Sequence, residues 1–140
     1  MKYTCAVIYT DGTKFLACHP TGKIKNQSYS LPKGISELNE DWKNAAVREL
    51  YEETSLSIDK NKLKYLGVFK HSIDKHLVLF LYKTNILPNI SSLKCLSKFE
   101  FNGKMIDEVD GYAYLNISTL NLLDRKTLPI IDQVKNLVFT

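Results

Sequence analysis

The length and composition of this chain are those of one ordinary globular domain. It has 140 residues, of which 44% are hydrophobic and 24% charged, and this is enough for a buried core. The net charge of +4 suits a phosphate-rich ligand but is too small to indicate a dedicated nucleic-acid-binding protein.

Three features bear on the location of the protein. Cys5, Cys18 and Cys95 are odd in number and form no CxxC pair, which argues against a disulfide framework or a zinc site and favours a reducing, cytoplasmic compartment. The N-terminus passes directly into strand-like sequence, so we expect no signal peptide. The longest apolar run, Leu77–Tyr82, is too short to cross a bilayer, and we expect no association with a membrane.

The first elements in chain order form a hairpin. Tyr3–Tyr9 is β-branched and aromatic, which predicts a central strand. Asp11-Gly12 predicts a tight turn, and Lys14–Cys18 returns as the second strand. We interpret His19–Ser28 as a loop and Tyr29–Leu31 as a short strand stopped by proline.

A helix follows this hairpin. It is predicted to begin near Asn39–Asp41, where either of two residues can cap it, and to end around Thr54-Ser55. Beyond it, Leu63–His71 and His76–Lys83 read as a second pair of strands. The second of these strands is apolar on both faces, so we expect it to be buried.

The last third of the chain has weaker patterns. A short strand is predicted at Leu93–Leu96, a turn at Asn102-Gly103 and a last strand at Gly111–Leu115. Leu120–Asp124 is predicted to form a short helix, and Leu128–Val138 an amphipathic terminal helix. Its apolar face contains Ile130, Ile131, Val134 and Leu137. The order of strands and helices indicates an α/β fold with a mixed sheet.

The central helix has an anomalous face. At about 100° per residue, Glu52 and Glu53 fall within about 60° of Glu49, so the three carboxylates share one stripe. The same stripe contains the helix residues expected to pack on the sheet, which are Trp42, Ala45, Ala46 and Leu50. Like charges at this spacing repel one another, and the C-terminal end of a helix disfavours anions. Cations would offset both effects, and carboxylate oxygens are the ligands that Mg²⁺ and Mn²⁺ require.

The spacing of these residues is specific. Five residues separate Gly34 from Glu40, seven more lead to Arg48-Glu49-Leu50, and Glu52-Glu53 follows after one residue. This pattern resembles the Nudix box, GX5EX7REUXEEXGU, in which U is aliphatic. Ser55 stands where the box has its last glycine. That residue follows the helix in a conformation with φ > 0, so serine is expected to cost about 1 kcal/mol there without removing a ligand.

Two flanking segments extend the resemblance. Leu31-Pro32-Lys33-Gly34 looks like the lead-in of the Nudix branch that includes dinucleoside polyphosphate hydrolases and RNA 5′-pyrophosphohydrolases. Asp107–Tyr112 (DEVDGY) is similar to the PE(F/V)DGW segment of that branch, whose Glu assists catalysis and corresponds to Glu108. Tyr112 stands where the branch usually has Trp. The resemblance implies one Nudix domain over residues 1–140, an α/β/α sandwich with the box on a loop–helix–loop.

The resemblance also implies roles for individual residues. Mg²⁺ or Mn²⁺ would be bound by the box carboxylates and the Gly34 carbonyl, and Lys33 would contact a substrate phosphate. Arg48 would hold a box carboxylate by an ion pair, with Glu40 in a similar supporting role. Glu108 would be the general base or an extra metal ligand, with Glu100 or Glu49 as the alternative base. The carboxylates are Glu49, Glu52 and Glu53.

Other aromatic and histidine residues receive structural interpretations. His19, which opens the predicted loop, has no ligand spacing to the other histidines. Trp42 lies on the apolar stripe and is expected in the core. Tyr112 and Tyr114 are also expected to be core residues, although one of them could stack on a nucleobase.

The implied activity is metal-dependent hydrolysis of a phosphoanhydride in a nucleoside diphosphate linked to another group. The substrate expected from the branch is a (di)nucleoside polyphosphate or a triphosphorylated RNA 5′ end. ADP-ribose, an oxidised dNTP or a diphosphoinositol is the alternative substrate, and a non-catalytic nucleotide sensor is the alternative function. Sensors typically lose box carboxylates, and none is lost here. No obligate protein partner is inferred, and a homodimer is compatible with the sequence.

Overall fold

The main sheet of the protein is built around its first strand. In the computed structural model, which describes residues 1–24 and 26–140, β1 pairs in parallel with β5 and antiparallel with β2 and β3. The order across the sheet is β4-β5-β1-β2-β8, with β3 on β1. The strands are β1 (Lys2–Thr10), β2 (Phe15–Pro20), β3 (Lys33–Ile35), β4 (Lys64–Ser72), β5 (Lys75–Lys83) and β8 (Val109–Leu115).

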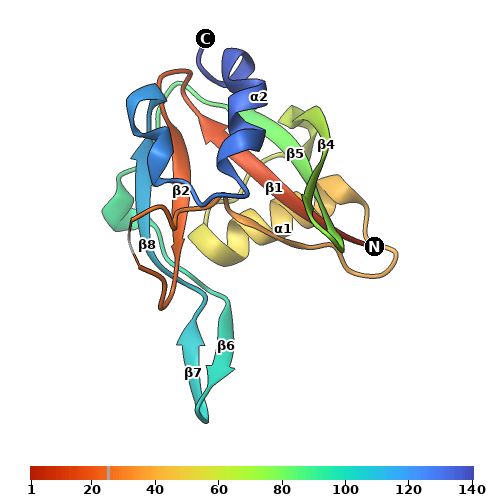
Figure 1. Cartoon of the computed structure of the whole chain (residues 1–140), viewed down its shortest axis with the longest axis vertical. Coiled ribbons are helices and arrows are strands. Elements are labelled where there is room, and N and C mark those ends of the chain that lie inside the picture. Colours follow the sequence, from red (N-terminus) through yellow and green to blue (C-terminus); the bar gives the residue numbers. More distant parts are fainter. Residues whose placement is uncertain (25) are drawn as a thin grey trace.

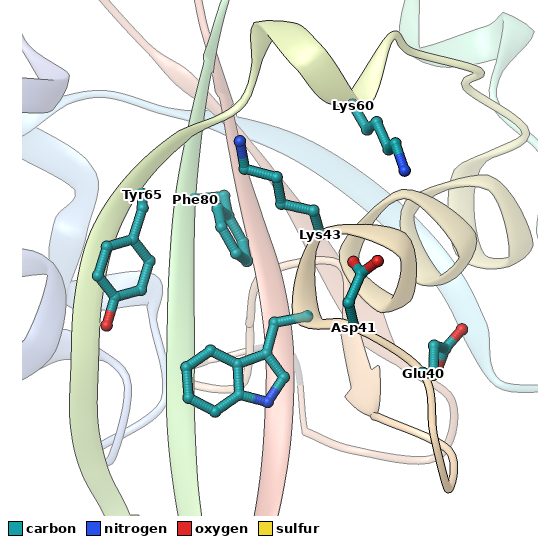
Figure 2. Close-up of a pocket in the computed structure, with 7 residues that line it drawn as sticks. Glu40, Asp41, Lys43, Lys60, Tyr65 and Phe80 are labelled. Atoms are coloured by element: carbon teal, nitrogen blue, oxygen red, sulfur yellow. The ribbon is translucent and has the colours of Figure 1, made fainter.

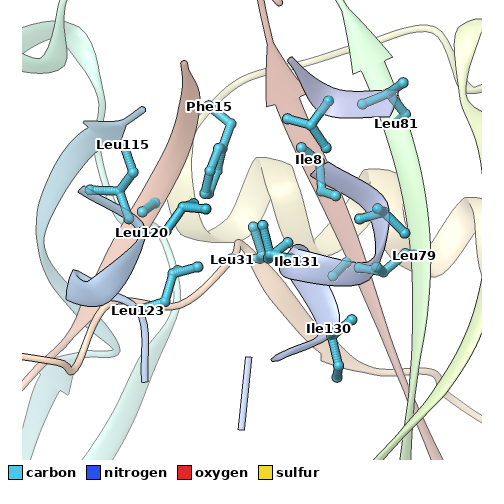
Figure 3. Close-up of a cluster of buried hydrophobic side chains, with 14 of the residues drawn as sticks. Ile8, Phe15, Leu31, Leu79, Leu81, Leu115, Leu120, Leu123, Ile130 and Ile131 are labelled. Carbon is cyan, nitrogen blue, oxygen red and sulfur yellow. The ribbon is translucent and has the colours of Figure 1, made fainter. Parts of the chain in front are cut away.

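Two α-helices cover opposite faces of this sheet (Figure 1). Because side chains alternate along a strand, Ala6 and Ile8 of β1 pack on the side of α2 (Leu128–Val138). Cys5 and Val7 pack on the side of α1 (Trp42–Thr54). Figure 3 shows the α2 side of the core, with Ile130 and Ile131 among the residues of the sheet. This arrangement confirms the predicted α/β fold with a mixed sheet.

Most predicted elements are confirmed with small changes at their ends. Asp41 caps α1, because its Oδ1 accepts the Asn44 N–H at 2.8 Å. This confirms one of the two predicted starts of the helix. Residues 77–81 of β5 are buried, as its apolar sequence predicts. In α2, Val138 is buried and Leu137 is exposed, so the apolar face ends one residue later than predicted.

The predicted strand at Tyr29–Leu31 is wrong. This segment forms only two isolated bridges, Cys18 with Ser30 and Tyr29 with Leu123. The strand lies after the proline instead, as β3. Pro32 lacks an N–H but keeps its acceptor, and its carbonyl accepts the Val7 N–H at 3.3 Å, so it begins the pairing with β1 and does not stop it.

The predicted strand at Leu93–Leu96 is also wrong, because this segment crosses the C-terminal end of α1. The Lys94 N–H donates to the Thr54 carbonyl at 3.2 Å and the Leu96 N–H to the Glu52 carbonyl at 2.6 Å. These bonds satisfy helix carbonyls that lack partners within the helix. The predicted turn at Asn102-Gly103 is confirmed, and it joins β6 (Lys98–Phe101) to β7 (Lys104–Asp107) in a hairpin that projects from the sheet (Figure 1).

Short 3₁₀ helices complete the fold. The helix predicted at Leu120–Asp124 begins earlier, at Ile117, because the Asn116 side chain caps it by accepting the Ser118 N–H at 2.9 Å. The 3₁₀ helices are η1 (Lys60–Lys62), η2 (Ile90–Ser92) and η3 (Ile117–Leu122). Within the described residues, no helix has both the length and the apolar character needed to traverse a bilayer.

Candidate active site

Carboxylates on the apolar stripe of α1 are buried toward the sheet. Glu49 is 8% exposed and Glu53 is 7% exposed, whereas the Glu52 side chain lies at the edge of the stripe and is partly exposed. Ala45, Ala46 and Leu50 of the same helix are fully buried against β1. The predicted inward orientation is therefore confirmed for two of the three carboxylates. Trp42 was expected in the core, but it is only partly buried. Its ring packs on Tyr3 with ring centroids 5.1 Å apart.

The C-terminal end of α1 is tightly held. Ser55 has φ 66° and ψ 8°, so it occupies the left-handed position predicted for it, and its N–H donates to the Tyr51 carbonyl at 2.8 Å. The Tyr112 hydroxyl donates to the Glu53 carbonyl at 2.5 Å. Tyr112 is partly buried on the α1 side of the sheet, and its hydrogen bond joins β8 to the helix end. The carboxylates are thus carried on a helix end to which two separate segments, residues 94–97 and β8, are hydrogen-bonded.

Arg48 donates hydrogen bonds to three carboxylates around the helix. Its Nε donates to Glu40 Oε2 at 2.8 Å and its Nη2 to Glu40 Oε1 at 3.0 Å, a bidentate pair. Its Nη1 donates to Glu49 Oε1 at 2.7 Å and to both oxygens of Glu52 at 3.2 Å. The hydrogen bonds from Arg48 hold the pKa of Glu40 below its usual value. Glu40, nine residues before Glu49 in the chain, is thereby brought into one network with the helix carboxylates.

Glu53 lies on the opposite side of this network and has no cationic side chain bonded to it among the described residues. Its Oε1 accepts the backbone N–H of Lys33 at 3.2 Å. Burial raises the pKa of Glu53 to about 8, and the nearby charge of Lys33 offsets part of this effect. Burial also raises the pKa of Glu49, and the hydrogen bond from Arg48 counteracts that shift. Burial therefore disfavours the charged form of both carboxylates, and the positive charge nearby offsets only part of this effect.

Gly34 is packed against the Glu49 carboxylate. A Cβ atom on residue 34 would lie 2.0 Å from Glu49 Cδ and 2.2 Å from each carboxylate oxygen. Residue 34 is opposite Cys5 in the pairing of β3 with β1, so the backbone has little freedom to retreat. Glycine is required here for close approach, a reason that the sequence pattern alone did not reveal.

A cavity of about 210 Å³ lies beside the buried carboxylate of Glu53. It brings together three groups from separate parts of the chain, Lys33, Glu53 and Glu108. Glu100 lies elsewhere, exposed on β6 opposite Met105. The lining residues are Cys18, Pro20, Ser30, Leu31, Lys33, Glu53, Glu108 and Val109.

The backbone of Glu108 is held on both sides. Its N–H donates to the Ser97 carbonyl at 3.0 Å, and its carbonyl accepts the Thr21 N–H at 3.0 Å. Ser97 itself donates its N–H to the Glu52 carbonyl at 3.1 Å. A continuous chain of hydrogen bonds thus connects the end of α1 to the loop that carries Glu108.

The sequence interpretation missed the role of His19. β2 continues through His19 to Pro20, so His19 is a strand residue and not the start of a loop. It is 1% exposed, its Nδ1 is hydrogen-bonded to the Asp110 carboxylate, and its ring packs edge-on against Tyr29. Asp110 follows Glu108 by two residues, so this pair joins β2 to β8 next to the cavity. The only sequence signal was the position of Asp110 within the DEVDGY segment.

The predicted metal ligands suit a hard divalent cation. In their present conformations, no three His, Cys, Asp or Glu side chains among residues 1–24 and 26–140 are close enough together to form a metal-binding group. Arg48 holds Glu49 and Glu52, and Glu53 faces the Lys33 N–H. All the donors are nevertheless oxygens, and burial disfavours the charge on Glu49 and Glu53, which a bound cation would stabilise. The chemistry of the residues present therefore fits Mg²⁺ or Mn²⁺.

Comparisons with known proteins agree with this fold. The family model described as the NUDIX domain matches residues 2–130. An uncharacterized 17.7 kDa protein of Enterobacteria phage T4, from the e-segB intergenic region, is 39% identical over 100 residues, which are 68% of this chain and 65% of the phage protein.

Solved structures share the fold at low identity. The E. coli ORF135 protein has a TM-score of 0.68 and 18% identity, over 98% of this chain and 90% of its own. A C. elegans Ap4A hydrolase has a TM-score of 0.67 and 14% identity, over 96% of both chains. The MutT/nudix family protein of Enterococcus faecalis has a TM-score of 0.59 and 19% identity over 82% of this chain, which spans only 43% of that protein.

The sheet, its two helical layers and the acidic helix define a Nudix-type α/β domain. The family model covers most of the chain, and the chain belongs to the NUDIX domain family.

Proposed function

We propose that this chain is a metal-dependent hydrolase that cleaves a phosphoanhydride bond in a nucleoside diphosphate linked to another group. One observation carries the proposal: the cavity at the end of α1 is lined by the buried carboxylate of Glu53, the exposed carboxylate of Glu108 and the cation of Lys33. A metal-binding carboxylate, a base and a phosphate-binding cation are the three groups that such a hydrolysis needs. Membership of the NUDIX domain family supports the same reaction.

The α1 carboxylates Glu49, Glu52 and Glu53, together with the Gly34 carbonyl, would hold Mg²⁺ or Mn²⁺. When bound, the ion neutralises phosphate charge and lowers the pKa of a water molecule. Arg48 keeps Glu49 oriented through the 2.7 Å hydrogen bond from its Nη1, and Glu40 holds the other side of the guanidinium. Arg48 and Glu40 thus act by positioning the ligands.

Lys33 and Glu108, which both line the cavity, act on the substrate. Lys33 contacts a substrate phosphate, because its side chain lies next to the buried carboxylate and is the cation that lines this cavity. Glu108 accepts the proton of the attacking water as general base. The backbone of Glu108 is hydrogen-bonded to Ser97 and to Thr21, so the loop holds the carboxylate at the cavity.

The substrate is a (di)nucleoside polyphosphate or a triphosphorylated RNA 5′ end. The sequence segments around Lys33 and Glu108 that line the cavity are those that resemble the branch acting on such molecules. The net charge of +4 suits a ligand with several phosphates. A C. elegans Ap4A hydrolase has the same fold, which is compatible with this choice.

The experiment is a substrate panel assayed with Mg²⁺ and with Mn²⁺. It spans diadenosine polyphosphates, ADP-ribose, 8-oxo-dGTP and triphosphorylated RNA, and it measures release of phosphate and nucleotide. We expect hydrolysis of a dinucleoside polyphosphate or of the RNA end, and none without a divalent cation. Glu53→Gln is the inactive control. Nucleotide binding without hydrolysis of any panel member would instead identify a non-catalytic sensor.

A further inference from the structure

A second cavity, of about 600 Å³, lies between the start of α1 and strands β4 and β5 (Figure 2). It shares no lining residue with the cavity of Glu53 and Glu108. We propose that this cavity binds a planar aromatic ring that carries a phosphate, as in a mononucleotide. The site is additional to the hydrolytic site proposed above and does not depend on it. The cavity is lined by Glu40, Asp41, Trp42, Lys43, Lys60, Tyr65 and Phe80.

Aromatic side chains form the walls of the second cavity. Trp42 is supported from behind by Tyr3, with ring centroids 5.1 Å apart. Tyr65 of β4 packs on Phe80 of β5 with centroids 5.8 Å apart, and Figure 2 shows these two rings on the strand side of the cavity. Phe80 is 2% exposed, whereas Tyr65 is 52% exposed. The cavity thus combines a fixed floor with accessible aromatic walls, a combination that suits stacking of a flat ring.

The carboxylates at the rim of the second cavity already have partners. Asp41 accepts hydrogen bonds from the Asn44 N–H and Nδ2, each at 2.8 Å. Glu40 accepts the bidentate pair from Arg48. These hydrogen bonds hold both carboxylates in place, although the donors to Asp41 are uncharged and leave its negative charge at the rim.

The two lysines of the second cavity lack such partners. Within residues 1–24 and 26–140, none of the ion pairs includes Lys43 or Lys60. Figure 2 shows Lys43 on the helix side, together with Asp41. Both ammonium groups are therefore available to a phosphate, which an ammonium group binds as a point charge. The volume also falls within the range of about 300–1,000 Å³ that ligand sites occupy.

Trp42 makes a direct test possible. It is the only tryptophan of the chain, so tryptophan emission reports on this cavity alone. The probe is adenosine 5′-monophosphate, titrated into the full chain without divalent metal. We expect a saturable change in emission, and equilibrium dialysis should return the same Kd. The double variant Lys43→Ala/Lys60→Ala should raise Kd by at least about tenfold, because both phosphate contacts are lost.

Matched variants separate this site from its surroundings. Lys62→Ala removes the same charge two residues from Lys60, but Lys62 lines a different cavity, so Kd should change by less than about twofold. Tyr65→Ala should weaken binding of the nucleotide, since the exposed ring supplies a wall. Glu53→Gln should leave the emission change intact even though the hydrolytic site is altered.

Three results would overturn the proposal. The first is the absence of binding at millimolar nucleotide by both emission and dialysis. The second is an unchanged Kd in Lys43→Ala/Lys60→Ala. The third is loss of binding in Glu53→Gln with retention in the lysine variant, which would assign the nucleotide to the hydrolytic cavity. Hydrolysis by Lys43→Ala/Lys60→Ala is measured in parallel, so failure of this proposal and failure of the proposed hydrolysis remain distinguishable.

Discussion

Gly34 and Glu49 occupy adjoining space, because a Cβ atom on residue 34 would lie 2.0 Å from Glu49 Cδ. Fifteen residues after Gly34, the carboxylate of α1 returns to the backbone of β3. The contact gives a physical reason for a glycine at position 34 in this chain. The separation brings the carboxylate to the strand, and only glycine leaves room for it.

Gly34→Ala tests this contact. The added methyl group meets the mobile end of a side chain, so we expect the protein to fold and the Glu49 carboxylate to move away from Arg48. Displacement of a ligand by about 1 Å typically lowers the rate by about 10²-fold. The measurement is kcat/KM with Mg²⁺. Gly111→Ala is the control, since its Cβ would only contact His19 Cβ at 3.7 Å, and full activity in Gly34→Ala would contradict the prediction.

Glu53→Gln should abolish hydrolysis and stabilise the metal-free protein. The unfolded chain releases the Glu53 proton near pH 4.5, whereas the folded chain retains it up to about pH 8. The folded state therefore loses stability relative to the unfolded state as the pH rises between these values. Gln removes that loss and keeps an acceptor for the Lys33 N–H.

The measurement for Glu53→Gln is the Tm without metal across this pH range. We expect the variant to exceed the wild type at pH 8 by at least about 3 °C and the difference to shrink toward pH 4.5. Glu100→Gln changes the same group on the exposed hairpin and should leave the Tm nearly unchanged. A lower Tm in Glu53→Gln at pH 8 would contradict the argument from burial.

Glu108→Gln should lower kcat by at least about 10²-fold, the typical loss when a general base is removed. The Kd for the metal should change little, because the proposed ligands lie on α1 and at Gly34. Glu100→Gln should retain the wild-type rate, since Glu100 lies outside the cavity that Glu108 lines. The reverse ranking of these two variants would transfer the role of base to Glu100, and unchanged rates in both would transfer it to Glu49.

Arg48→Lys should weaken binding of Mg²⁺ by about 10–100-fold, as loss of groups that orient metal ligands does. A lysine keeps the charge but cannot hold Glu40 by two parallel hydrogen bonds while also holding Glu49. Calorimetric titration of the metal measures the effect. Arg125→Lys, at an exposed position, is the matched control and should bind as the wild type does.

Ser55→Gly should stabilise the protein, because Ser55 has φ 66° and glycine adopts that conformation without strain. A gain of about 1 kcal/mol corresponds to a Tm increase of about 3–5 °C for a chain of this size. Thermal unfolding measures it. Ser57→Gly, at an exposed position without positive φ, should leave the Tm unchanged or lower it. An equal gain in both variants would show that the effect is not due to the backbone conformation at Ser55.

The sequence by itself determined the features that depend on residues close together in the chain. Helix α1 and the inward stripe with Glu49 and Glu53 follow from local periodicity. Capping chemistry limited the start of the helix to two residues, one of them Asp41, and the resemblance to the box predicted the left-handed end at Ser55. The buried strand β5 and the central strand β1 follow from their apolar, β-branched and aromatic residues in the same way.

Only the tertiary structure decided which distant segments meet. The hydrogen bonds from residues 94–97 to the end of α1 position the loop of Glu108 at the helix and leave Glu100 on a projecting hairpin. The pairing of β2 with β8 brings His19 to Asp110, and the pairing of β4 with β5 brings Tyr65 and Phe80 opposite Trp42. These contacts depend on strand register and on the path of loops across the sheet. Such long-range choices are made by the packing of the whole chain and leave no periodic trace in any one segment.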